Sequence, residues 1–211
     1  MMRLVNLDPI VDRVRRQAPA APIPLIESNI IDKAIELCEA VPVWRDTDVL
    51  NFGENDPCEY LMSVPQAEIY RIETATMNGR PLERIRAEEL DRRYPNWMDD
   101  KPGENIPRFV TQLSANTLRL YPANKCTVHV RLWLKPSIEC DVLPSDIVSQ
   151  HGTLLWQGAA GEILLMPDAE LANPQLGARL LAKFEGGLDT LRTNHTRTQL
   201  RAPLRTKPSF M

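Results

Sequence analysis

The sequence predicts an α+β protein: an α-helical bundle of N-terminal helices and a C-terminal helical hairpin, with an inserted small antiparallel β-domain and an extended C-terminal arm. Apolar residues recur at helical spacing near both ends of the chain, whereas the middle alternates as strands do. The last residues include basic but no acidic side chains. The predicted boundaries are 1–44 and 137–195 for the helical domain, 45–136 for the β-rich domain and 196–211 for the arm.

Two helices are predicted in the N-terminal part, over residues 7–17 and 25–41. In each of them apolar residues recur three or four positions apart, so that they share one helical face. The prolines between the helices make residues 18–24 an extended connector, because a proline biases the residue before it away from the helical region. Pro42 ends the second helix.

The middle of the chain has the composition of short strands. Residues 127–134 alternate apolar side chains with polar or aromatic ones, which is the period of a half-buried strand. Asn78-Gly79 is a hairpin-turn signal that follows another such segment. Residues 87–93 add one or two helical turns, and residues 97–107 form a loop. Further strands are expected at 60–64, 69–76 and 117–121.

A helical hairpin is predicted in the last third of the chain. Its first helix covers residues 144–166 and is ended by Pro167. Asn173-Pro174 begins the second helix, which runs to about residue 194. The small residues at 158–161 leave room for a neighbouring helix to approach the first helix closely.

Composition and charge restrict the possible functions. With 43% apolar and 25% charged residues the chain is expected to be globular, and its 18 prolines punctuate short elements. Five of the 25 Lys and Arg residues, but none of the 28 Asp and Glu residues, follow Asp189, so the remainder carries 20 basic against 28 acidic groups. This acidic body argues against general binding to duplex DNA, and an acidic wall would repel DNA and let it slide.

The cysteines and the hydropathy point to a reduced compartment. Four cysteines without CxxC spacing are expected to be buried thiols rather than ligands: Cys38, Cys58, Cys126 and Cys140. No apolar run approaches the roughly 18 residues of a membrane span, and no signal-type stretch follows Met1. We therefore expect a protein that is made in the cytoplasm, is not secreted and has no membrane partner.

No catalytic residue, metal site or cofactor is predicted. His129 is expected on the outer face of a strand, His151 on the apolar stripe of a helix and His195 at the start of a solvated tail. The acidic segment 53–59, from Gly53 to Glu59, misses the spacing of a calcium-binding EF-hand, so a solvated loop is favoured. The segment 158–161 is not a phosphate loop, because no strand precedes it and no Lys-Ser/Thr follows.

The acid-free tail has two interpretations of equal weight. It is either a frayed terminus or an arm that becomes ordered on a partner. In the second interpretation, apolar residues between the charges would anchor it.

Several short segments follow one another in a characteristic order. After the N-terminal helix ends near Trp44, they are IYRI at 69–72, NGRPL at 78–82, ELDRRYPNW at 89–97, PRF at 107–109, TLRLYP at 117–122, VLPSD at 142–146, NP at 173–174 and AKFEGGL at 182–188. Their order and spacing resemble those of head-to-tail adaptor (connector, or head-completion) proteins of short-tailed bacteriophages. The resemblance runs through most of the chain.

The resemblance implies a structural virion protein rather than an enzyme. Such adaptors form a ring, usually of twelve copies, beneath the portal at the head–tail junction, and genomic DNA passes through without sequence-specific binding. The implied partners are other copies of the chain, the portal protein and a downstream tail or nozzle protein. The position of the acid-free tail, where the arm of such an adaptor should be, assigns the portal-binding arm to Arg197, Arg201, Leu204, Arg205, Lys207 and Phe210. The subunit-packing helix faces would contain Gly158, Ala159, Leu181 and Phe184.

Two alternatives remain. The nearest is a tail nozzle or tube subunit of the same kind of virion. The other is a nucleic-acid-binding module that uses the basic arm on phosphates, which the acidic body disfavours. An enzyme acting on the cell envelope would need a constellation of acids or histidines that the sequence does not contain.

Overall fold

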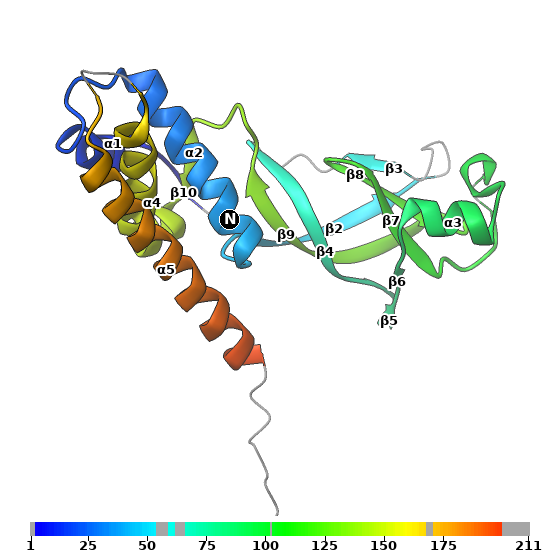
Figure 1. The fold of residues 1–211 in the computed structure, drawn as a ribbon. Helices are drawn as coiled ribbons and strands as arrows, with labels where there is room; N and C mark the ends of the chain where they lie inside the picture. Colours follow the sequence, from blue (N-terminus) through cyan, green and yellow to red (C-terminus); the bar gives the residue numbers. More distant parts are fainter. Residues whose placement is uncertain (1–2, 54–58, 62–65, 102, 168–170, 200–211) are drawn as a thin grey trace, which may run out of the picture. The chain divides into compact units, whose positions relative to one another are not determined.

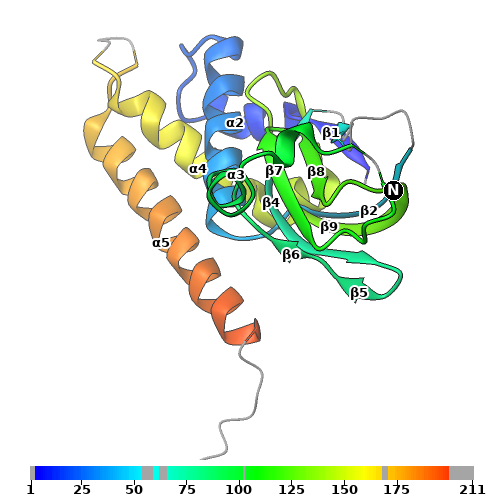
Figure 2. The ribbon, with the colours of Figure 1, turned by 90° about the vertical axis from the view of Figure 1, so that its right-hand side faces the viewer.

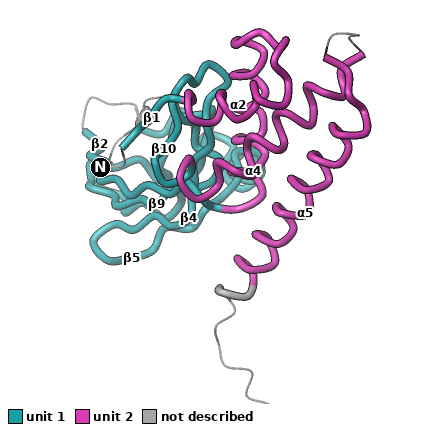
Figure 3. The backbone as a smooth tube through the Cα atoms, turned by 90° about the vertical axis from the view of Figure 1, so that its left-hand side faces the viewer, with its two compact units in different colours: residues 1–6, 42–147 teal, residues 7–41, 148–211 magenta. Residues whose placement is uncertain are grey.

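The structure, a computed structural model, describes residues 3–53, 59–61, 66–101, 103–167 and 171–199 (Figure 1). The chain divides into two compact units, each built from two separate stretches of sequence (Figure 3). We call residues 1–6 and 42–147 the β unit, and residues 7–41 and 148–211 the helical unit.

Each helix of the helical unit begins at or beside a proline. Its described helices are α1 (Asp8–Arg15), α2 (Ile23–Ala40), α4 (Ser145–Leu165, whose first residues count with the β unit) and α5 (Pro174–Gln199). Helix α2 begins earlier than predicted because Pro24 fits the first turn, where the missing N–H would have no helical acceptor. It ends at Ala40, since Val41 is extended before Pro42.

The β unit contains three sheets in its described residues. One pairs β1 (Leu4–Asn6) with β10 (Val142–Pro144). The second has the order β2 (Arg45–Phe52), β9 (Cys126–Pro136), β4 (Ala67–Met77) and β5 (Arg80–Pro81). The third has the order β3 (Glu59–Leu61), β8 (Thr117–Tyr121), β7 (Phe109–Ser114) and β6 (Glu83–Arg84).

Strand β9 confirms the alternation read from the sequence. Its residues Val128, Val130, Leu132 and Leu134 are buried, and the residues between them are exposed or half-buried. It pairs antiparallel with β2 on one side and β4 on the other. The β9 strand is therefore the centre of its sheet, which explains why its apolar face is the most regular in the sequence.

The predicted hairpin turn is also confirmed. Asn78 and Gly79 both have positive φ, at 49° and 75°, between β4 and β5. Both central residues of a type I′ turn require positive φ, and this turn matches the twist of the flanking strands.

An apolar cluster of the β unit includes side chains from α3 (Ala87–Arg93) and the 3₁₀ helix Trp97–Asp99. Its buried side chains are those of Ile85, Leu90, Trp97 and Phe109. The indole N–H of Trp97 donates to Asp91 at 2.6 Å, so the one polar atom of this ring has a partner.

The predicted fold class is wrong in its layout. The chain is α+β, but its described strands form three sheets, the helices do not dominate, and it is not a helical bundle carrying a small β-insertion. Residues 4–6 form a strand that pairs with 142–144 instead of belonging to the helices. Strands of two or three residues, such as β1 and β6, have too few residues to show an alternation. They form because a distant segment supplies the ladder partner.

Candidate partner-binding end of helix α5

A buried lysine lies where α2, α4 and α5 meet. Lys33 is 6% exposed, and its Nζ is 2.9 Å from the Glu36 carboxylate and 2.5 Å from that of Glu162 on α4. The same Nζ lies 5.1 Å from the centre of the Phe184 ring on α5. Burial alone would lower the pKa of the Lys33 ammonium, but the hydrogen bonds to Glu162 and Glu36 outweigh it and raise the pKa.

Glycines allow α4 and α5 to approach until their backbones touch. A Cβ on Gly158 would lie 2.8 Å from Cδ2 of Phe184 and 2.9 Å from Cγ of Lys33. A Cβ on Gly161 would lie 2.9 Å from the backbone N of Leu181, and one on Gly177 would lie 2.9 Å from the carbonyl oxygen of Gly161. The close approach expected at 158–161 is confirmed, and the neighbouring helix belongs to the same chain.

The predicted subunit-packing residues lie in this contact. Gly158, Ala159 and Phe184 are buried by the chain's own helices, and Leu181 is half-buried against Gly161. Gly158 packs against Phe184 and Lys33 of the same chain, and Ala159 is fully buried.

Helix α5 continues well past its last buried residue. Leu188 is 2% exposed, and none of residues 189–196 is buried. The helix nevertheless runs to Gln199. Residues 189–199 add about 16 Å of helix at 1.5 Å per residue. Figures 1 and 3 show this end of α5 extending beyond the other helices of its unit. Leu191 and His195 are half-buried and continue the stripe of Phe184 and Leu188.

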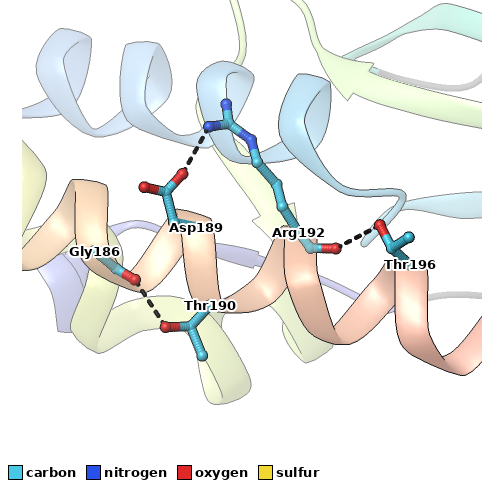
Figure 4. Close-up of polar contacts among 5 residues, drawn as sticks. All are labelled: Gly186, Asp189, Thr190, Arg192 and Thr196. Atoms are coloured by element: carbon cyan, nitrogen blue, oxygen red, sulfur yellow. Dashed lines mark hydrogen bonds and ion pairs between the residues drawn. The ribbon is translucent and has the colours of Figure 1, made fainter.

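The side chains at this end of α5 make their recorded polar contacts within the helix (Figure 4). The Thr190 hydroxyl donates to the Gly186 carbonyl at 2.8 Å, and the Thr196 hydroxyl donates to the Arg192 carbonyl at 2.9 Å. The Arg192 guanidinium lies 3.1 Å from the Asp189 carboxylate. All of these contacts lie within α5, so they leave its outer face available to another molecule.

The charge of this segment differs from that of the rest of the chain. Asp189 is the last acidic residue, and the five basic groups after it include Arg192 and Arg197 within α5. Cations near the C-terminal end of a helix are favoured by its macrodipole. The end of α5 thus combines an exposed helical face with a positive charge.

The predicted arm begins later than expected. Residues 196–199, including Arg197, belong to α5 rather than to an extended arm. Residues 189–199 contain no proline or glycine, so nothing in this stretch breaks the helix that the packed residues before it have begun. The other predicted contacts lie outside the described residues: Arg201, Leu204, Arg205, Lys207 and Phe210.

The histidines do not form a catalytic constellation in the described chain. His129 is exposed on β9, as predicted, and His151 is half-buried on α4, where burial lowers its pKa. His195 lies within α5 and not in a solvated tail, which corrects the prediction.

No metal site is found among the residues that the structure describes, since no three His, Cys, Asp or Glu side chains there are grouped suitably. Residues 54–58 of the acidic segment, which include Cys58, lie outside them. Cys38 and Cys140 are buried, as expected, whereas Cys126 is half-buried. Within the same residues, no helix is long and apolar enough to cross a bilayer.

No protein-family model matches this chain, and no curated protein is significantly similar to it.

The close approach of α4 and α5 predicts opposite effects for two glycine substitutions. Gly158→Ala should lower the free energy of unfolding by about 1–3 kcal/mol, because the added methyl overlaps Phe184 and Lys33. Gly186→Ala is the matched control on the exposed face of α5, where an added Cβ meets nothing within 4 Å. It should raise stability by about 0.5–1 kcal/mol through helix propensity. Equal effects in urea denaturation would contradict the described contact.

Burial of His151 predicts a specific dependence of stability on pH. Its pKa is lowered from the ordinary 6.5, so between the folded and unfolded pKa values the unfolded state binds the proton more readily. Protonation of His151 therefore lowers the free energy of unfolding as the pH falls below about 6.5. His151→Gln should remove this component from urea denaturation measured between pH 7.5 and 5. The exposed-site variant His129→Gln should retain it, and identical pH profiles for the two variants would disprove the assignment.

Proposed function

We propose that this protein is a structural head-to-tail adaptor of a phage virion, one subunit of a ring that joins the portal to the tail around the DNA channel. The end of α5 is the observation that carries the proposal. It is a helix that continues past its own core, with basic residues and no acid after Asp189.

A helical segment of this kind has a physical reason to bind a partner. Isolated helices of this length are marginal in water, and most helical stability in proteins comes from packing of an apolar face. Residues 189–196 include no buried side chain, although half-buried Leu191 and His195 continue the packing stripe. A partner surface that packs on the exposed face of this segment and pairs with its arginines would stabilise it. A portal with an acidic rim has the matching charge.

The charge of the remainder of the chain supports a passage for DNA rather than a DNA-binding surface. Up to Asp189 the chain carries 20 basic and 28 acidic groups. Such a surface would repel phosphates, whereas proteins that hold duplex DNA neutralise them with Lys and Arg. Head-to-tail contacts between identical copies close into a ring when the rotation between neighbours closes.

Removal of the last residues of α5 together with the tail tests the proposal directly. Deletion of residues 196–211 should change the free energy of unfolding by less than about 1 kcal/mol, because the last buried residue of α5 is Leu188 and exposed surface changes cost little. The deletion should abolish co-sedimentation with portal rings of the same virion. Truncated protein that still caps these portals would contradict the proposal.

A matched pair of full-length variants separates charge from length. Changing four arginines of the segment to glutamine should weaken attachment, and changing the same four to lysine should preserve most of it, since lysine keeps the charge. The substituted positions are Arg192, Arg197, Arg201 and Arg205. Electron microscopy of the same samples should show rings. Tubes that form without portal would favour the nozzle subunit, and tight binding of free DNA that falls steeply with salt would favour the nucleic-acid-binding module.

A further inference from the structure

The β unit contains a cleft that the proposed function does not use. Its volume is about 820 Å³, and it is lined by residues of β4, β6, β7 and the start of α3. Figures 1 and 2 show β6 and β7 beside β4, with α3 following β6 along the chain. The volume lies within the range of about 300–1,000 Å³ that is typical of small-molecule sites.

The charged groups of the cleft are mainly basic. Arg71 on β4 and Arg84 and Arg86 from the other wall line it, against one acid, Glu88. Among the described residues, Arg71 and Arg86 form no side-chain hydrogen bond or ion pair, and both are exposed. Guanidinium groups present N–H donors in a planar fork that matches phosphate and carboxylate oxygens. The cleft therefore carries positive charge that the described chain does not neutralise.

A buried hydroxyl in the cleft also lacks a protein partner. Thr111 on β7 lines the cleft, is only 1% exposed, and no described residue offers its Oγ1 a hydrogen bond. A buried polar group without a partner costs free energy, and nearly all such groups in proteins are satisfied. Because Oγ1 itself is sealed from solvent, this hydroxyl belongs to the wall of the cleft and not to the surface that a ligand would touch.

Hydrogen bonds between the walls hold the cleft in shape. The Arg84 guanidinium donates to the Ile72 carbonyl of β4 at 2.6 Å, and the Gln112 side-chain amide donates to the Ile69 carbonyl at 2.9 Å. The ladder between β4 and β9 is irregular between Ile69 and Arg71 and again after Ile72. Such bulges redirect side chains and are frequent beside functional sites.

The walls also have an apolar part. The Tyr70 side chain, 41% exposed, lines the cleft together with Ile72 and Ile85. The Tyr70 ring packs edge-on against Trp133, with 5.1 Å between centroids. A ligand that fills the cleft would place an organic group on this wall and an anionic group near the arginines.

We propose that this cleft binds a small organic anion, whose phosphate or carboxylate group is held by Arg71 and Arg86 and whose organic part covers Tyr70. All residues of the cleft belong to the β unit, so the binding test is independent of the proposed role of α5.

The probes for the test are phenyl phosphate, benzoate, inorganic phosphate and neutral benzyl alcohol, titrated into the full chain by calorimetry. Phenyl phosphate or benzoate should bind, and the stronger of the two identifies the anionic group. Backbone amide NMR shifts should change at Arg71 and Thr111. Absence of binding by both aromatic anions, or equal binding of benzyl alcohol, would overturn the proposal. Inorganic phosphate that binds as tightly as phenyl phosphate would overturn the organic part of it.

Two arginine double variants supply the matched comparison. Arg71→Gln with Arg86→Gln should weaken binding of the aromatic anion roughly tenfold or more, since charge-assisted hydrogen bonds are lost. Arg80→Gln with Arg131→Gln removes the same charge from exposed strand positions outside the cleft and should leave binding unchanged. Equal loss in both double variants would show a general charge effect and contradict the site.

Discussion

The close contact of α4 with α5 is the constraint on which the helical unit depends. Gly161 and Gly177 let the two backbones touch, and Gly158 leaves the space that Phe184 and the buried stem of Lys33 occupy. The ammonium of Lys33 is buried only because carboxylates on α2 and α4 accept its hydrogen bonds, since an unpaired buried cation would be costly. Larger side chains at these glycines would force the helices apart and expose that charge.

This contact divides α5 into two parts with different roles. The part up to Leu188 is held by the core of the helical unit, whereas the part after it contains no buried side chain among residues 189–196. A rigid base thus presents a basic helical end whose outer face is uncovered by the described chain. The β unit is organised around β9, whose alternate residues are buried and which pairs with β2 on one edge and β4 on the other. Its cleft is preorganised by bonds such as that from Arg84 to Ile72.

Elements with strong periodic patterns could be predicted from the sequence, whereas short or context-dependent elements could not. The helices α2, α4 and α5, the strand β9 and the turn at Asn78-Gly79 follow from apolar spacing, proline stops and glycine conformation. The layout was mispredicted because β1 and β6 exist only through pairing with distant segments. Among the sites, the basic end was visible as a run without acids. The cleft was not, because its arginines are ordinary strand and loop residues until the fold brings them together.

The sequence by itself determined the strongly periodic elements and the separation of charge, because spacing and composition act over a few residues. It also placed small residues at 158–161 where a close helix contact was needed. Only the tertiary structure decided which helix fills that space, how far α5 extends beyond Leu188, and that Thr111 shares a cleft with Arg71 and Arg86. These features depend on contacts between residues far apart in the chain, and no local pattern specifies such contacts.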